Sequence, residues 1–87
     1  QLAKDYRAFL YVDEAHATGL YGEQGYGLTC PYADDIDLSM GTFSKGLGSN
    51  GAYIACSTAV KRYLINRSPG VVYSTAPSPM QIAAMRA

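Results

Sequence analysis

An excess of charge of either sign is missing from this 87-residue sequence. Lys and Arg together number seven, Asp and Glu also number seven, and the formal net charge is therefore zero. Nucleic-acid-binding domains carry a clustered basic excess, which this balance does not supply. No apolar run approaches the roughly 20 residues of a membrane-spanning helix, and residues 1–10 lack the basic-then-apolar pattern of a signal peptide. We expect a cytoplasmic protein that binds neither nucleic acid nor a membrane.

Cysteine and histidine are also scarce. Cys30 and Cys56 stand alone, with no Cys-x-x-Cys pair and no histidine at ligand spacing. That arrangement argues against a zinc site or a redox pair. The sequence predicts two reduced thiols and no metal centre.

Short apolar runs rich in β-favouring residues recur along the chain. They occupy residues 9–12, 36–40, 51–56 and 71–73, and each predicts a strand or extended segment. Residues 18–28 contain four glycines and therefore predict a loop or a series of tight turns.

Helical segments are expected between and around these strands. Residues 1–7 are helix-like, Ser57 or Thr58 can cap a second helix that Pro69 ends, and residues 79–87 follow the favoured order of a cap and then a proline. Alternating strands and helices predict an α/β fold with a mainly parallel sheet. Since the sequence starts and stops within helix-like stretches, we expect residues 1–87 to be part of a larger α/β domain, incomplete at both ends.

Three polar clusters follow the apolar runs directly. They are residues 13–16, 42–45 and 74–75. In open α/β sheets, ligands bind at the carboxyl ends of the strands. We therefore expect the three clusters to meet at one edge of the sheet.

The residue types in these clusters fit pyridoxal 5′-phosphate (PLP). The amine of Lys45 can form a Schiff base with the aldehyde, and Asp13 can keep the ring nitrogen protonated. His16 can contact the phenolic oxygen. Thr42 and Ser44 can bind the phosphate through hydroxyl groups and backbone N–H groups. These residues are the candidate catalytic and cofactor-binding set.

Each of these residues also has a structural interpretation. A single lysine is most often a solvated surface charge, and an aspartate at a strand end often caps the next turn. A lone histidine is usually structural, and the two hydroxyl residues fit a turn equally well. Glu14 should point away from Asp13, because successive side chains of a strand alternate, and we assign it a structural role.

Two other motifs in the sequence point to different chemistry. Residues 10–16 match the strand and Asp-Glu-Ala-His of a helicase nucleotide site, but no Gly-x4-Gly-Lys-Ser/Thr phosphate loop is present. Gly46, Gly48 and Gly51 spell the dinucleotide fingerprint, but they precede a predicted strand at residues 51–56 where the fingerprint requires a helix. Neither interpretation is favoured.

The combined motifs resemble the α-oxoamine synthases, which belong to the aspartate-aminotransferase-like (fold type I) PLP enzymes. The resemblance runs from about Phe9 to the C-terminus. It is carried by Val12-Asp13-Glu14-Ala15-His16, by Gly19, Gly22, Gly25 and Gly27, and by Gly41-Thr42-Phe43-Ser44-Lys45-Gly46.

The resemblance implies a role for each matching residue. Asp13 would pair with the pyridinium nitrogen, His16 would contact the phenolic oxygen, Thr42 would bind phosphate, and Lys45 would hold the cofactor covalently. The hydroxyl of Thr75 would reach the cofactor phosphate of the other subunit, which implies a homodimer with active sites at the interface.

The resemblance also implies a reaction. Family members condense an amino acid with an acyl thioester and release carbon dioxide. The sequence is most similar to the branch of biotin biosynthesis, which joins L-alanine to a pimeloyl thioester. Residues 41–45, which include the lysine, are equally similar to serine palmitoyltransferases. Three alternatives stay open. They are another branch of the family, another fold type I enzyme such as a transaminase or lyase, and a non-catalytic relative that supports a partner subunit.

Overall fold

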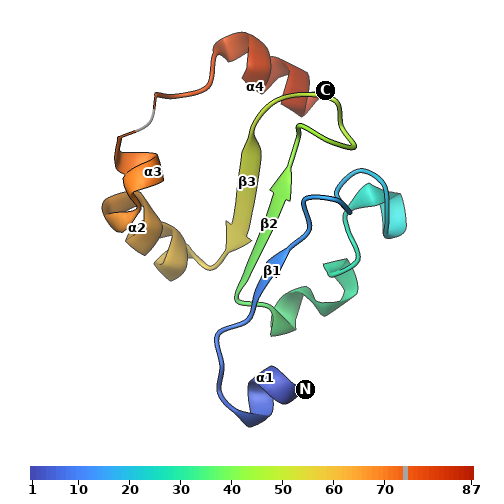
Figure 1. Cartoon of the computed structure of the whole chain (residues 1–87), viewed down its shortest axis with the longest axis vertical. Coiled ribbons are helices and arrows are strands. Elements are labelled where there is room, and N and C mark those ends of the chain that lie inside the picture. The colour runs from blue at the N-terminus through green and yellow to red at the C-terminus, as the bar shows by residue number, and fades with distance from the viewer. Residues whose placement is uncertain (74) are drawn as a thin grey trace.

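The computed structural model describes residues 1–73 and 75–87 and contains one small sheet with helices around it (Figure 1). In chain order the elements are α1 (Leu2–Asp5), β1 (Tyr11–Asp13), two 3-10 helices (Glu23–Gly25 and Cys30–Asp35), β2 (Leu38–Thr42), β3 (Ala52–Cys56), α2 (Thr58–Arg67), α3 (Pro69–Val72) and α4 (Pro79–Arg86). In the part of the chain so described, no helix is long and apolar enough to cross a membrane.

The sheet has the order β1-β2-β3 and is mixed. β1 and β2 are parallel, with Tyr11 opposite Leu38 and Asp13 opposite Met40. β2 and β3 are antiparallel, because residues 43–51 form a connection shorter than the dozen or more residues that a parallel crossover needs. The α/β class is confirmed, but only one of the two described strand pairings is parallel.

The first two strands begin later than their apolar runs. The carboxylate of Asp37 accepts a hydrogen bond of 2.7 Å from the Leu10 backbone N–H, and the Leu10 carbonyl accepts bonds from the N–H groups of Asp37 and Leu38. The parallel ladder therefore starts at Tyr11, and Phe9 precedes it as an exposed side chain. β2 extends through Thr42, two residues beyond the predicted strand.

The helix caps follow the sequence expectations. The Ser57 hydroxyl accepts a hydrogen bond from Val60 N, and α2 ends before Pro69. At α4 the Ser78 hydroxyl accepts a bond from Gln81 N while the Gln81 side chain accepts one from Ser78 N, which is a complete capping box.

The predicted extended segment at residues 71–73 is wrong in its first two positions. Residues Pro69–Val72 form the single helical turn α3, closed by a 3.1 Å hydrogen bond from Tyr73 N to the Pro69 carbonyl. Proline has the backbone angle of a helix and lacks an N–H that a first helical position would leave unpaired. This local preference outweighs the weak β-preference of two valines.

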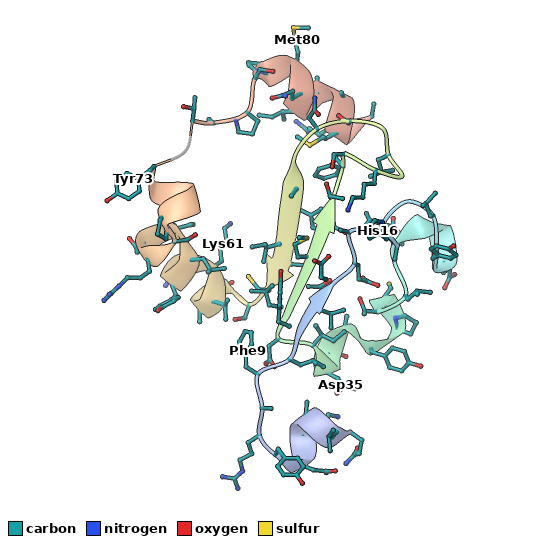
Figure 2. The ribbon with its side chains drawn as sticks, in the orientation of Figure 1. Phe9, His16, Asp35, Lys61, Tyr73 and Met80 are labelled. Carbon is teal, nitrogen blue, oxygen red and sulfur yellow. The ribbon has the colours of Figure 1, made fainter. Side chains whose placement is uncertain are left out.

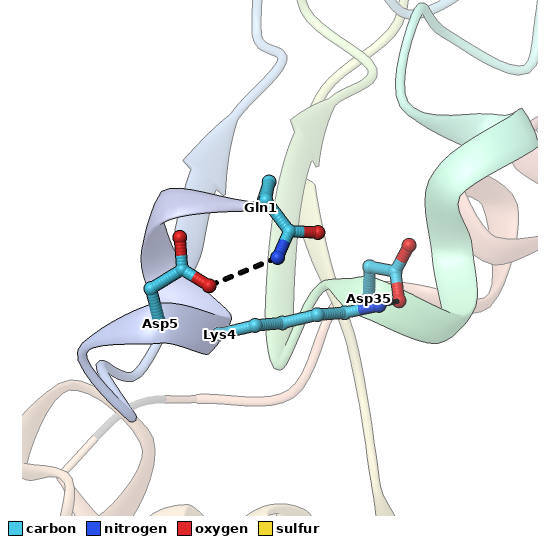
Figure 3. Close-up of polar contacts among 4 residues, drawn as sticks. All are labelled: Gln1, Lys4, Asp5 and Asp35. Carbon is cyan, nitrogen blue, oxygen red and sulfur yellow. Dashed lines mark hydrogen bonds and ion pairs between the residues drawn. The ribbon is translucent and has the colours of Figure 1, made fainter.

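The N-terminal helix is tied to the second 3-10 helix by an ion pair (Figure 3). Lys4 Nζ lies 2.6 Å from Asp35 Oδ1, and Gln1 Nε2 donates to Asp5 Oδ1 at 2.9 Å. The hydrogen bond from Lys4 and its positive charge hold the pKa of Asp35 below its ordinary value. Both side chains are largely exposed, so the pair orients α1 more than it stabilises the fold.

Most of the buried residues lie near the ends of β1 and β2, with Leu38 at the start of β2 as the exception, while many large apolar side chains are exposed. Ala15, Glu14, Thr18, Leu38 and Thr42 are buried. Figure 2 shows Tyr73 and Met80 directed away from the rest of the chain, and their exposures are 86% and 83%. The most tightly packed part of the described chain is thus the edge at which the sequence predicts the site.

Tyr53 of β3 lies across Gly41 of β2, its partner in the antiparallel register. A Cβ added to Gly41 would lie 2.5 Å from Tyr53 Cζ, so that only glycine fits beneath the ring. The Tyr53 ring also contacts Phe43, with ring centroids 5.4 Å apart, and its hydroxyl lies 3.3 Å from Thr18 Oγ1. The Tyr53 side chain therefore reaches from β3 across β2 to the turn that follows β1.

We predict that Gly41→Ala lowers the free energy of unfolding by about 1–3 kcal/mol, because the new methyl group displaces the Tyr53 ring. Gly70→Ala is the matched control, since its Cβ would meet nothing closer than Ser68 Oγ at 3.9 Å. Urea unfolding of both variants gives the comparison. Equal stability of the two variants would contradict the proposed packing constraint.

Candidate active site

Lys45 and His16 come together from different segments of the chain. Lys45 lies in the connection between β2 and β3, and His16 lies on the turn that follows β1 (Figure 2). Lys45 Nζ is 3.3 Å from His16 Nε2. Both side chains are exposed and line a cleft of about 550 Å³ together with Asp13. The predicted convergence of residues 13–16 with residues 42–45 is confirmed.

The turn that carries His16 is built on the backbone of Glu14. The Glu14 N–H donates to the Met40 carbonyl at 2.7 Å and so continues the parallel ladder by one bond. The Glu14 carbonyl then accepts bonds from Ala17 N, Thr18 N and the Thr18 hydroxyl. This tight turn aims His16 away from the sheet edge toward Lys45.

Asp13 uses one carboxylate oxygen to shape the same turn. Asp13 Oδ1 accepts a 2.9 Å hydrogen bond from Ala15 N, which is the capping role that a strand-end aspartate often has. Among the described residues, Asp13 Oδ2 has no hydrogen-bond partner. The structural and the cofactor roles of Asp13 are therefore compatible, since each needs a different oxygen.

The base of the lysine connection is closed by hydrogen bonds to one carbonyl. The Gly51 carbonyl accepts from Phe43 N at 2.9 Å and from the Thr42 hydroxyl at 3.0 Å. Thr42 Oγ1 also lies 2.7 Å from Ser44 Oγ and accepts a bond from Ser44 N. Because Thr42 gives its only proton to Gly51, Ser44 supplies the proton shared by the two hydroxyls. To bind an anion at this corner, the exposed Ser44 hydroxyl would have to turn this proton away from Thr42.

Thr75, from the third predicted cluster, is not among the described residues that line this cleft. Thr75 is exposed and belongs to no helix or strand, and Ser74 lies outside the described residues. The role expected for Thr75 concerns a second subunit, and it stays a prediction.

Three further residues line the cleft that sequence reasoning did not single out. They are Tyr21, Leu28 and Thr29, which flank or belong to the glycine-rich segment after His16, and Ala17 lines the cleft beside them. Thr29 is held by Glu14, whose carboxylate is buried and accepts bonds from Thr29 N at 2.9 Å and from the Thr29 hydroxyl. The sequence contained one indication of this contact, namely the position of Glu14 directly after Asp13. Its carboxylate points to the opposite face of the strand from Asp13 and needs hydrogen-bond donors there.

Metal and nucleotide chemistry find no support at this edge. Within residues 1–73 and 75–87, no group of three or more His, Cys, Asp and Glu side chains could hold a metal ion. Cys30 and Cys56 are free thiols, as expected. Gly51 is followed by β3, where a dinucleotide fingerprint would have a helix.

The residues of the cleft fit PLP by their chemistry. A primary amine, an imidazole and a carboxylate with one free oxygen share one opening, and two hydroxyl groups stand at the base of the lysine connection. An aldehyde, a phenolic oxygen, a pyridinium nitrogen and a phosphate are groups that these side chains bind. The cleft is open enough for the lysine amine to be approached from outside.

Comparison with known proteins agrees with this chemistry. A putative 8-amino-7-oxononanoate synthase from Magnetococcus marinus is 57% identical over 86 residues, which cover 99% of this chain and 22% of that protein. A serine palmitoyltransferase from Sphingomonas wittichii superposes with a TM-score of 0.83 at 29% identity, over 95% of this chain and 21% of the other. A serine palmitoyltransferase variant from S. paucimobilis, solved with a bound PLP–myriocin aldimine, gives a TM-score of 0.81 at 26% identity, over 95% and 22% of the two chains.

The chain spans about a fifth of the length of these relatives. Its whole length, residues 1–87, matches the family described as aminotransferase class I and II. The chain therefore belongs to the aminotransferase class I and II family.

Proposed function

We propose that this chain is the lysine-bearing part of a PLP-dependent α-oxoamine synthase, and specifically of an 8-amino-7-oxononanoate synthase. The reaction joins L-alanine to a pimeloyl thioester and releases carbon dioxide and the free thiol. The single observation that carries the proposal is the 3.3 Å approach of Lys45 Nζ to His16 Nε2 in the cleft that Asp13 also lines. The identity of 57% with a putative member of this branch supports the choice of substrates.

PLP, when bound, supplies an electron sink for charge that develops at the α-carbon of an amino acid. Lys45 holds the aldehyde carbon and moves the proton at that α-carbon. His16 Nε2 lies within hydrogen-bond distance of the Lys45 amine, which orients the amine within the cleft. Both roles require an amine that substrate can reach, and Lys45 is exposed.

Asp13 and the hydroxyl residues hold the rest of the cofactor. Asp13 Oδ2 would accept a hydrogen bond from the protonated ring nitrogen and keep it charged, while Oδ1 stays on the Ala15 N–H. Ser44 and Thr42 bind the phosphate at the base of the lysine connection. Thr75 serves the phosphate site of a second subunit, so that the active enzyme is a homodimer in this proposal. We propose the cytoplasm as its location.

The chain is one part of a larger domain in this proposal. The exposure of Phe9, Tyr73 and Met80 supports this view, because such side chains are normally covered in a folded enzyme. The acyl thioester would then contact residues outside this chain as well. All functional experiments below use the complete protein.

Other members of the class differ in their substrates. Serine palmitoyltransferase, glycine C-acetyltransferase and 5-aminolevulinate synthase share the reaction type, and the structural likeness to serine palmitoyltransferase favours the first of them. Release of carbon dioxide from L-alanine with pimeloyl-CoA, compared with L-serine and palmitoyl-CoA, separates the branches. A transaminase or lyase would release none with either acyl-CoA, and a non-catalytic subunit would turn over neither amino acid.

We predict that borohydride reduction of the complete protein with PLP attaches a pyridoxyl group to Lys45. Peptide mass mapping locates the group. Lys45→Ala should lose the adduct and at least about 10²–10⁴-fold of the turnover, because the amine that moves the proton is gone. Lys61→Ala, an exposed residue of α2 outside the cleft, is the matched control and should keep both (Figure 2). An adduct on another lysine with Lys45 unmodified would refute the proposal.

We predict that Asp13→Asn keeps the cofactor but slows proton removal from L-alanine by about 10²–10³-fold, because the charge opposite the ring nitrogen is lost. The asparagine oxygen can still accept the Ala15 N–H, so the turn is preserved. Exchange of the α-proton in D₂O, followed by NMR, measures the effect. Asp34→Asn, an exposed residue of the second 3-10 helix, provides the control. Unchanged exchange in Asp13→Asn would contradict the role of Asp13.

A further inference from the structure

The cleft is lined by two groups of residues that Glu14 connects. Asp13, His16 and Lys45 supply the proposed cofactor contacts, and Leu28 and Thr29 belong to the segment that follows the glycine-rich loop. Glu14 lines the same cleft and lies between these two groups of residues.

The Glu14 side chain holds the loop segment. Its Oε1 accepts a 2.9 Å hydrogen bond from Thr29 N, and its Oε2 accepts one from the Thr29 hydroxyl. Gly27 passes so close that a Cβ there would lie 2.5 Å from Glu14 Oε2, and its φ of +97° favours glycine. The loop between residues 27 and 29 is thus wrapped around the carboxylate.

Burial makes these contacts hard to replace. Glu14 is only 7% exposed, and in the described residues no cation lies within ion-pair distance of it. A buried carboxylate is costly unless donors satisfy it, so the two Thr29 groups and Glu14 constrain each other strongly. Removal of the carboxylate would leave the Thr29 N–H without its partner.

The backbone of Glu14 holds the turn that carries His16, and it does so independently of the Glu14 side chain. Its N–H donates to Met40 O and its carbonyl accepts from Ala17 and Thr18, contacts that a change of side chain leaves in place. Loss of the carboxylate should therefore release Leu28 and Thr29 while Asp13, His16 and Lys45 remain in position.

We propose that Glu14 is a positioning residue that fixes Leu28 and Thr29 across the cleft from Lys45 and thereby sets the fit of the amino-acid substrate. This inference rests on the proposed function. It predicts separate effects on two quantities, namely little change in cofactor attachment to Lys45 and a large change in the KM for L-alanine.

The test compares four variants of the complete protein. Glu14→Ala removes both contacts to Thr29, and Thr29→Val removes only the hydroxyl contact. Glu14→Gln keeps both, since its amide oxygen can accept from Thr29 N and its NH₂ can donate to the Thr29 hydroxyl. Thr29→Ser keeps both groups and is the matched control. The measurements are the pyridoxyl adduct on Lys45, kcat, and the KM for L-alanine at saturating pimeloyl-CoA.

We expect Glu14→Ala to raise the KM for L-alanine about 10-fold or more, as the loss of a charge-assisted hydrogen bond warrants, with adduct yield unchanged and kcat within about 3-fold. Thr29→Val should shift KM in the same direction by less, while Glu14→Gln and Thr29→Ser stay near the parent value. If Glu14→Ala does not accumulate as folded protein, the KM of Thr29→Val decides.

Two results would overturn the inference. One is an unchanged KM in Glu14→Ala or, where that variant fails to fold, in Thr29→Val. The other is a loss of adduct in proportion to activity, which is the behaviour of a merely structural residue. A parent protein that forms no adduct on Lys45 would instead remove the proposed function, so the two failures are distinguishable.

Discussion

The parallel pairing of β1 with β2 is the constraint on which the candidate site depends. It places Asp13 opposite Met40, and the next bond, from Glu14 N to Met40 O, fixes where the chain leaves the sheet. β2 continues two residues further, so the lysine connection departs from the same edge. A shift of this register by one residue would exchange the faces of Asp13 and Glu14 and separate the carboxylate from Lys45.

Much of the site could be predicted from the sequence because its parts are local. Asp13, His16, Thr42 and Lys45 each follow a short apolar run, and the ends of adjacent parallel strands meet at one edge. The caps at Ser57 and Ser78 are equally local, since each needs only donors within the next turn. Such features depend on a few neighbouring residues and tolerate errors in strand boundaries.

The features that could not be predicted depend on contacts between distant residues or on competing preferences. The bonds of Glu14 to Thr29 join residues fifteen apart through a loop whose path glycine leaves open. Tyr53 requires Gly41 opposite it, which follows only from the antiparallel register of β3. At residues 71–72 the valines favoured a strand, and the proline before them determined a helical turn instead.

The Gly51 carbonyl accepts two hydrogen bonds, and this has a consequence for the reactivity of Lys45. Phe43 N and the Thr42 hydroxyl close the lysine connection at its base, so the main chain on either side of Lys45 is already ordered by the sheet. Ordering a reactive group before its partner arrives raises its effective concentration, because less conformational entropy is lost when the bond forms. An amine on a closed loop can therefore remain open to solvent and still be confined near His16. Confinement by the backbone, rather than burial of the side chain, is the means by which this short segment would concentrate the proposed nucleophile.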